Sequence, residues 1–548
     1  MKKSRILAFI LAAAMPLSLL SCSDNSGSSD SETKTTAAEE DTSSGDTGNI
    51  DLKSLSIPYE PVDLDEYRPH ITALLDDIKE SGNRDKVKKD IELILEGCKK
   101  LDDANARICL NYYLDFNNED LEAEYDACTV DFNVLTSLAL LAFTRCSEED
   151  EYKDLVKDYL TEDNIDYFSP HFMSPKRVEG YTRVDSALSD EMLDEYYDIY
   201  EDEEMDEEDK ELRCAEIYLD ILAEEDYDEL FLEYGRDFSP ELANELADEV
   251  LDEIFPAYMY LGRAFFELDG ADEILDDELE VEAGSPFDVI KKYSEKLDPD
   301  IEKYANKIID DELFCMTSDD NAYPGSFTLE LPATDDAFIF VNSPDDLYSL
   351  STSIHEFGHF YSCYASGGKP FNPAFCVDVA EIQSQGFEFL FTQFYDDIFG
   401  DKSEAMKAYR VIEMLDSIIG GFTVGKFENT ILQQRDDLTP QDVVDIWHEI
   451  ADGNISYSFY EFNHIFESPG YYLSYGTSAL AAFDIWRELQ TSPDKALKMY
   501  KKLSEVSAYS HDTFFCTALD ECGFSDVMSK KYIRSLAKEV KSYADTLE

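Results

Sequence analysis

The chain has 548 residues, of which 122 are acidic and 45 are basic, so its formal net charge is -77. A field of that sign repels the phosphates of nucleic acids and of anionic lipids, which excludes nucleic acid as a partner. Hydrophobic residues make up 44% of the chain, which is enough for a large buried core and excludes a largely disordered protein.

The amino terminus has the composition of an export signal. The positive stretch MKKSR precedes an apolar run over 6–20 that is shorter than the ~20 residues of a membrane span. The sequence LLSC at 19–22 resembles a bacterial lipoprotein signal, which implies removal of residues 1–21 and a lipid on Cys22. We therefore expect a lipoprotein anchored in the bacterial cell membrane and facing outside the cytoplasm. An ordinary secretory signal with an incidental cysteine is the alternative.

Residues 22–50 are rich in Ser, Thr, Asp and Gly, bury nothing and predict a flexible tether. From about residue 60 onward, apolar residues recur at spacings of three and four, as in KDIELILEGCKKL (89–101), which predicts amphipathic helices. A very acidic stretch at 195–211 is interpreted as a solvated helix face and as a boundary. It divides an amino-terminal helical region (51–200) from a second region (201–548).

One segment departs from the helical period. SFTLELPATDDAFIFVN, residues 326–342, has two short β-rich runs around a proline and a pair of aspartates. This pattern predicts a β-hairpin. Ten cysteines besides Cys22 are scattered along the chain without a CxxC pair, so their disulfide state stays open.

The sequence HEFGH begins at His355. His355 and His359 lie one turn apart on the same face of a predicted helix, where both imidazoles can reach one metal ion. Glu356 lies beside them and can take a proton from a water on that ion. Gly358 costs about 1 kcal/mol of helix propensity relative to alanine, which predicts that another element packs closely there.

A catalytic zinc site needs three protein ligands and one open position. CVDVAEIQSQGFEF (376–389) predicts a second helix that could cross the first, with Glu381 as the third ligand. Asp378, one turn earlier, could hold the other ring nitrogen of a ligand histidine. Glu388 lies two turns beyond Glu381 on a similar face and is the next candidate for the third ligand. An ordinary acidic residue with no role at the metal is the alternative for Glu381 and for Asp378.

HEFGH followed by AEIQSQGFE resembles the thimet oligopeptidase, neurolysin and oligoendopeptidase F family of zinc metallopeptidases, whose pattern is HExGH with a downstream E-x-x-S-x-x-x-E. Residues 322–356 resemble the hairpin that leads into the zinc helix of that family. GFTVGKFENTI (421–431) and HIFESPGYYLSYGTSALAAFDIW (464–486) resemble a later helix and the His/Tyr-rich loop of oligoendopeptidase F. The resemblance covers about 320–490.

The resemblance implies a mainly α fold of the zincin oligopeptidase type. Two helical halves surround a deep substrate channel, and a small β-hairpin or sheet lies next to the zinc helix. It also implies one zinc ion per chain, bound by His355, His359 and Glu381, with Glu356 as the general base. The region 201–548 is then the catalytic zinc peptidase region.

The same resemblance places His464, Tyr471 and Tyr475 opposite the scissile carbonyl, as donors to a developing oxyanion. The order GYYLSY leaves Tyr472 as a rival to Tyr471. The alternative for these side chains is core packing. The other histidines, at positions 70, 171, 448 and 511, have no metal motif around them and are assigned no role.

We therefore expect a zinc-dependent endopeptidase that acts on short peptides, with the strand near Ala337 to Asn342 pairing with the substrate backbone. A catalytically inactive peptide-binding or sensing lipoprotein is the alternative; it would need the channel but not Glu356. An exopeptidase of the same superfamily is a further alternative. Cleavage preference and oligomeric state are left open by the sequence.

Overall fold

The computed structural model describes residues 62–547, except for 161–164, 166–177, 179–186, 203, 225–229, 233, 276–278, 280–284, 320, 344–345, 369–370, 372–374, 452 and 511. The predicted signal over 1–21, Cys22 and the tether over 22–50 lie outside the described residues, as do His171 and His511.

The described helices and strands before the HEFGH segment are α2 (Arg68–Asp77), α3 (Arg84–Leu114), α4 (Glu119–Ser147), α7 (Ala187–Glu201), α8 (Glu207–Ile221), α10 (Pro240–Glu249), α11 (Phe255–Phe265), α12 (Ala271–Leu275), α13 (Pro286–Leu297), α14 (Pro299–Asp310), β1 (Phe314–Thr317), β2 (Phe327–Leu331) and β3 (Asp336–Asn342). The later helices are α15 (Asp346–Ala365), α16 (Val377–Phe391), α17 (Tyr395–Phe399), α18 (Ser403–Gln434), α19 (Pro440–Ala451), α20 (His464–Glu467), α21 (Leu473–Leu489), α22 (Pro493–Ser504), α23 (Phe515–Cys522) and α24 (Lys530–Leu547). The predicted mainly helical fold class with a small sheet is confirmed.

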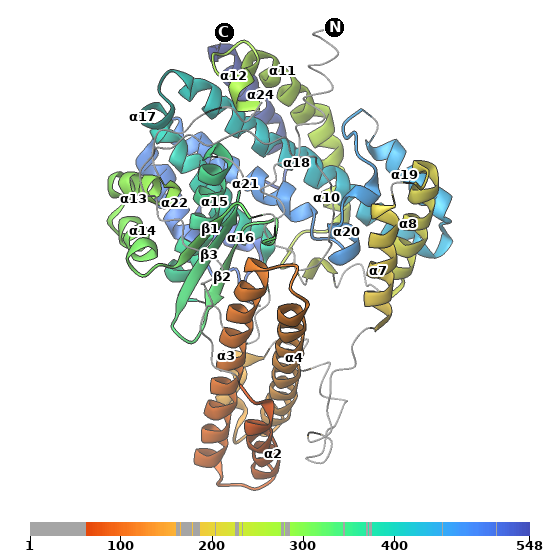
Figure 1. The fold of residues 1–548 in the computed structure, drawn as a ribbon, viewed down its shortest axis with the longest axis vertical. Coiled ribbons are helices and arrows are strands. Elements are labelled where there is room, and N and C mark those ends of the chain that lie inside the picture. The colour runs from red at the N-terminus through yellow and green to blue at the C-terminus, as the bar shows by residue number, and fades with distance from the viewer. Residues whose placement is uncertain are drawn as a thin grey trace, which may run out of the picture.

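Helices α2, α3 and α4 form a projection from the rest of the molecule (Figure 1). Asn118 caps α4, because its side chain accepts hydrogen bonds from the backbone N–H groups of Asp120 and Leu121. Within the described residues, α4 is also long and apolar enough to cross a membrane, but half of its apolar window is buried in the fold. Its buried side chains share a hydrophobic core with α2 and α3, as in a core helix of a globular protein.

The sheet has the strand order β1-β3-β2, with β1 parallel and β2 antiparallel to β3. Phe338 and Phe340 share a core with the carboxyl end of α3, whereas Ile339 and Val341 lie in the main core with α15. The hairpin predicted over 326–342 is confirmed, but its expected role is not. Strand β3 is the central strand, because Asp336 to Phe340 pair with β2 and Ile339 to Asn342 pair with β1, so it is not the edge strand that a substrate would extend. The edge strand of the hairpin is β2.

Buried side chains of α15, α16, α18 and α21 form a large part of the main core. Helices α18 and α21 cross closely at Gly421, where an added Cβ would lie 2.3 Å from the backbone nitrogen of Gly476. This contact holds α21 close to the long helix α18. Helix α21 also packs along α16, which carries the predicted third ligand.

A second core joins α7 and α8 to α19, α20 and the start of α21. Tyr196 of α7 stacks on Phe466 of α20, with 4.1 Å between the ring centroids. The domain boundary near residue 200 stays a prediction. Helix α7 belongs to the same core as α8, on the far side of that boundary.

None of the ten cysteines in the described residues forms a disulfide. They are distributed over four hydrophobic cores, each of which holds at least one buried thiol: Cys98 and Cys146, Cys109 and Cys315, Cys214, and Cys376 and Cys522. Burial raises the pKa of Cys315 to about 11 and that of Cys98 to about 12. The sequence left the disulfide state open, and within the described residues no cysteine is in a disulfide.

Candidate metal centre and active site

Helix α15 crosses α16 in close contact at Gly358. A Cβ added at Gly358 would lie 2.6 Å from the Cα of Ser384 and 2.7 Å from the carbonyl oxygen of Gln383. Both distances are too short for any other residue, so the glycine brings the two helices together. The two histidines on α15 thereby come within reach of α16.

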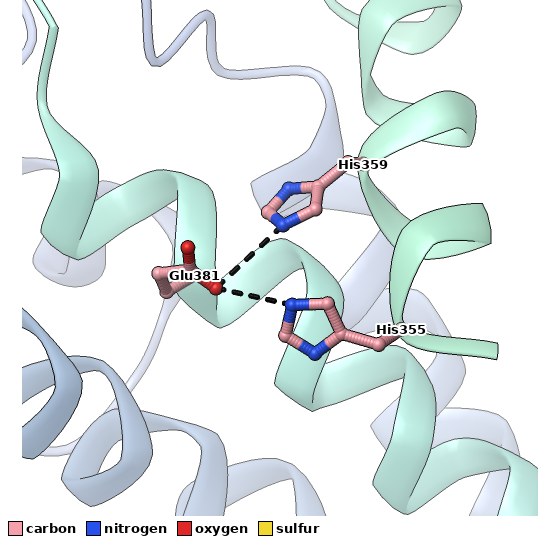
Figure 2. A group of neighbouring side chains, drawn as sticks. All are labelled: His355, His359 and Glu381. Carbon is pink, nitrogen blue, oxygen red and sulfur yellow. Dashed lines mark ion pairs between the residues drawn. The ribbon is translucent and has the colours of Figure 1, made fainter. Parts of the chain in front are cut away.

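His355 and His359 point from α15 toward Glu381 of α16 (Figure 2). The Nε2 atoms of His355 and His359 lie 3.4 Å and 3.6 Å from Oε2 of Glu381. Both Nε2 atoms are buried and have no hydrogen-bond partner. Although burial opposes ionisation, the two imidazoles hold the pKa of the Glu381 carboxyl well below its usual range.

These distances fit a zinc ion. With zinc–ligand bonds of about 2.0–2.2 Å, ligand atoms at neighbouring corners of a tetrahedron lie about 3.4 Å apart. Two imidazoles and one carboxylate are also a ligand set that catalytic zinc uses, and it leaves one position open. Within the part of the chain that the structure describes, these three residues form the one group of three or more His, Cys, Asp or Glu side chains placed this closely.

One carboxylate oxygen of Glu356 accepts a hydrogen bond, and the other accepts none. Its Oε2 accepts a hydrogen bond of 2.8 Å from the hydroxyl of Thr328 on β2, while its buried Oε1 has no hydrogen-bond partner. Burial raises the pKa of Glu356 above its ordinary value, which brings this carboxylate closer to the strength of a useful base. Thr328 was not among the predicted site residues.

Glu388 is the carboxylate that supports a ligand histidine. Its Oε1 lies 2.8 Å from Nδ1 of His355, and its other oxygen pairs with the guanidinium of Arg410 on α18. Arg410 also lies 3.0 Å from Glu413 and contacts the hydroxyl of Ser351. The sequence placed Glu388 on a face similar to that of Glu381, as the next candidate for the third ligand, and did not indicate its contact with His355 or Arg410.

Asp378 does not hold a histidine, so this part of the prediction is corrected. Its carboxylate is buried, lies 3.1 Å from Nε of Arg236, accepts a hydrogen bond of 2.9 Å from Ser474, and also contacts Thr477. Asp378 is three residues before Glu381, a shift of about 4.5 Å along the helix. Because of this shift, the Asp378 side chain contacts the first turn of α21 and not the histidines of α15.

Arg236 extends this network to the loop before α21. Its guanidinium donates to the carbonyl oxygen of Gly470 at 2.9 Å and lies over the rings of Phe231 and Tyr234. The backbone N–H of Gly470 donates to Glu428 at 2.7 Å. Gly470 has a φ of 81°, a conformation that favours glycine. The loop that leads into Tyr471 is therefore fixed on both sides.

His464, Tyr471 and Tyr475 form one buried cluster. The Tyr475 hydroxyl lies 3.4 Å from Nε2 of His464, and the rings of His464 and Tyr471 stack with 5.6 Å between centroids. Burial lowers the pKa of His464 to about 4, so its imidazole is neutral near pH 7. Tyr472 lies in the same cluster, edge-on to His464 and to Phe462, so the choice between Tyr471 and Tyr472 stays open.

Two histidines outside the cluster have ordinary partners. His448 is exposed and lies 3.2 Å from Glu211, and His70 lies 3.1 Å from Asp90.

No protein-family model and no curated protein matches this sequence. The fold is similar to solved structures. One is a protein assigned as an oligoendopeptidase F, with a TM-score of 0.70, 15% identity, and coverage of 90% of this chain and 98% of that one. PZ peptidase A in a complex with an inhibitor gives a TM-score of 0.70, 15% identity, and coverage of 90% and 99%.

A protein from Bacillus anthracis str. Ames, also assigned as an oligoendopeptidase F, gives a TM-score of 0.68 at 14% identity, with coverage of 89% and 97%. The similarity therefore extends over nearly the whole of each of these chains. The resemblance that the sequence predicts over 320–490 is confirmed at the level of the fold. At this identity the comparison concerns the fold alone, and the chain has the fold of oligoendopeptidase F.

Proposed function

We propose that the protein is a zinc-dependent endopeptidase that hydrolyses short peptides. The observation that carries the proposal is the convergence of His355, His359 and Glu381 at zinc-like spacing, next to Glu356. The names of the similar structures, oligoendopeptidase F and PZ peptidase A, support peptides as the substrates.

Bound zinc would polarise the scissile carbonyl and lower the pKa of a water molecule at its open position. Glu356 takes the proton of the attacking water on its open Oε1 and passes it to the leaving amine. Thr328 keeps the other oxygen of Glu356 in place during both transfers. One tyrosine of the cluster, together with neutral His464, donates to the oxyanion that develops on the carbonyl.

Strand β2 offers the substrate an edge. The backbone N–H of Ile339 donates to Leu313, on the β1 side of β3, so Ile339 and its partner Thr328 form a pair without mutual hydrogen bonds. The N–H and C=O of Thr328 consequently point away from β3. A peptide that pairs with this edge passes beside Glu356, because the Thr328 side chain contacts that carboxylate.

We also propose that the enzyme is a lipoprotein held outside the cytoplasm by a lipid on Cys22. The support is the LLSC signal and the Ser/Thr-rich segment behind it, which is long enough to separate the folded part from the membrane. The high negative charge of the chain opposes electrostatic binding to anionic lipids, so attachment depends on the acyl chains.

The test of the activity is a zinc measurement combined with an assay on an internally quenched peptide. We expect one zinc per chain, peptide cleavage that a chelator abolishes, and activity that returns when zinc is added. Glu381→Ala leaves two ligands and should lose most of the zinc. Full zinc occupancy in Glu381→Ala would contradict the ligand assignment. A zinc-loaded wild type that binds peptide but cleaves none would favour the peptide-binding lipoprotein.

A further inference from the structure

Arg236 is a buried arginine that joins three separate elements of the candidate site. Its side chain has no exposed surface. Its Nε donates to Asp378 of α16 at 3.1 Å, its Nη1 donates to the carbonyl oxygen of Gly470 at 2.9 Å, and its Nη2 donates to the hydroxyl of Ser474 on α21 at 2.7 Å. Because the donors of a guanidinium lie in one rigid plane, these three bonds also fix the directions between the elements.

Two of the acceptors of Arg236 lie next to the proposed oxyanion donors. Gly470 directly precedes Tyr471, and Ser474 directly precedes Tyr475. The carbonyl oxygen of Gly470 belongs to the peptide bond that joins it to Tyr471, so the hydrogen bond from Arg236 fixes the plane of that bond. Both phenols therefore leave the backbone beside positions that one guanidinium holds.

The third acceptor, Asp378, extends the contact to the helix of the third proposed zinc ligand. Asp378 is three residues before Glu381, which is about 4.5 Å along α16. Ser474 donates to Asp378 at 2.9 Å, and the hydroxyl of Thr477 also donates to it. Helix α16 and the first turn of α21 are thus joined through one carboxylate and one guanidinium, and the separation between Glu381 and the phenols depends on this junction.

Arg236 is itself held in place by its surroundings. Its backbone N–H donates to the carbonyl oxygen of Phe231 at 2.9 Å, and the carbonyl oxygen of the preceding Gly235 accepts a hydrogen bond of 2.8 Å from Phe515. The guanidinium carbon lies 5.2 Å from the ring centroid of Phe231 and 4.8 Å from that of Tyr234. The guanidinium is therefore a fixed point from which the three acceptors are oriented.

Stability alone is a weak reason for a buried ion pair at this place. The attraction between two buried charges offsets the loss of their hydration only in part, and apolar side chains of similar volume often stabilise a fold equally well. Catalysis, in contrast, requires that groups be placed within about 0.5 Å of the productive geometry. The directed hydrogen bonds of Arg236 supply an orientation that apolar packing would not.

We propose that Arg236 is a positioning residue of the peptidase, which holds the helix of Glu381 and the segment of Tyr471 and Tyr475 in the relative placement that peptide hydrolysis requires. The inference rests on the proposed peptidase function and adds one residue to its machinery. Arg236 touches neither the metal site nor the substrate in this role and acts through the phenols.

Arg236→Lys is the first test, because lysine keeps a positive charge beside Asp378 but cannot form the three directed bonds. We expect kcat to fall by about 10–100-fold, with KM and zinc content as in the wild type, because a small displacement of a reacting group slows the reaction that much. Arg487→Lys is the matched control. Arg487 lies in the last turn of α21 and pairs with Glu539, so this variant should keep the wild-type kcat. An unchanged kcat in Arg236→Lys would overturn the proposal.

A double-mutant cycle distinguishes positioning from a general loss of folded structure. If Arg236 acts through the oxyanion donor, Arg236→Lys should lower kcat by less than about 2-fold once the donor phenol is absent, as in Tyr475→Phe. The cycle is repeated with Tyr471→Phe, so that the donor is included in either case. An equal loss in the wild type and in both tyrosine backgrounds would overturn the proposal.

Ser474→Ala keeps the proposal testable where Arg236→Lys does not fold. It removes one of the three acceptors and leaves Arg236 paired with Asp378. We expect a smaller fall in kcat than in Arg236→Lys, again confined to the background that retains the donor phenol. A wild-type kcat in Ser474→Ala, in a protein whose Arg236→Lys variant is unfolded, would assign Arg236 to the fold alone and overturn its positioning role.

Fluorine NMR separates this inference from the proposed activity. Difluorotyrosine in place of Tyr471 or Tyr475 reports on the surroundings of each phenol. At least one of the two signals should shift or broaden in Arg236→Lys or Ser474→Ala, and neither should change in Arg487→Lys. A changed signal in a protein that cleaves no peptide would support the placement of the phenols by Arg236 and contradict the proposed function alone. Signals identical to those of the wild type would overturn the positioning role even in an active peptidase.

Discussion

Nδ1 of His355 lies 2.8 Å from Oε1 of Glu388, and the other oxygen of Glu388 is paired with Arg410. Three helices, α15, α16 and α18, thus contribute to the orientation of one imidazole. An imidazole that is held at Nδ1 presents Nε2 to the metal, which fixes both its tautomer and its direction.

Replacement of Glu388 should weaken zinc binding, although Glu388 is not a proposed ligand. Glu388→Gln loses the charge that holds His355 and removes one of the two carboxylates that Arg410 contacts. We expect zinc affinity to fall by about 10–100-fold, measured by competition with a chromophoric chelator. Glu413→Gln is the matched control, because Glu413 also contacts Arg410 but no hydrogen bond joins it to His355. Equal zinc affinity in Glu388→Gln and wild type would contradict this role.

Replacement of Glu356 should separate binding from turnover. Glu356→Gln keeps the size of the side chain and all three proposed ligands but cannot take up the water proton. Zinc content and peptide affinity should be retained, while kcat falls by about 10²–10⁴. Thr328→Val, which removes the hydrogen bond to Oε2, should lower kcat less and in the same direction. Near-normal turnover in Glu356→Gln would mean that another group accepts the proton.

A tyrosine of the His464 cluster should contribute to turnover and not to metal binding. We expect Tyr475→Phe to lower kcat by about 10²–10³ with zinc content unchanged, since it loses a donor to the oxyanion. Tyr471→Phe and Tyr472→Phe, measured beside it, show whether a different phenol is the donor. If none of the three variants loses activity, the cluster is core packing, the alternative that the sequence left open.

The buried imidazole of His464 should make stability depend on pH. Its pKa is about 4 in the folded protein against an ordinary value of 6.5, so between these values the unfolded chain takes up a proton that the folded chain does not. The folded state is therefore destabilised as pH falls from 6.5 toward 4, and this contribution is absent above that window.

Urea unfolding at pH 7 and at pH 4.5 measures this effect. Wild type should lose up to about 3 kcal/mol more of its free energy of unfolding than His464→Gln does over that interval. His448→Gln, at an exposed site, should behave as the wild type. An identical pH dependence in His464→Gln and wild type would exclude a buried neutral imidazole.

Attachment to the membrane should depend on Cys22. Labelled fatty acid should enter the wild-type protein, because acylation of that cysteine is the proposed anchor. Cys22→Ala should abolish the label and either release the protein into the medium or leave its precursor uncleaved. A wild-type chain that is unlipidated and has a mature amino terminus elsewhere would contradict the proposed anchor.

His355, Glu356 and His359 could be predicted because the local geometry of a helix places them. Two residues four apart in a helix share a face, so the spacing in HEFGH was sufficient to place His355 and His359 together. Gly358 carried a second local signal, since a glycine inside a helix indicated close packing, and the contact with Ser384 is what it permits.

The supporting residues could not be predicted in the same way. Thr328 is 28 residues from Glu356, and Arg236 is 142 residues from Asp378, so no spacing in the sequence links them. The edge of the sheet was assigned to the wrong strand for a related reason. Strand β1, FCMT, is four residues long and too short to show an alternating pattern, so the partner that makes β3 central went unrecognised.

The cysteines of the described residues, none of which forms a disulfide, can report on local unfolding of the protein. Each of the four hydrophobic cores contains a buried thiol, and a thiol reacts with an alkylating reagent only when its surroundings open. Pulses of such a reagent, followed by peptide mass spectrometry, would rank the cores by how readily each one opens, without a single introduced probe. Cys98 and Cys146 would report on the projecting helices, and Cys376 on the start of the helix that carries Glu381.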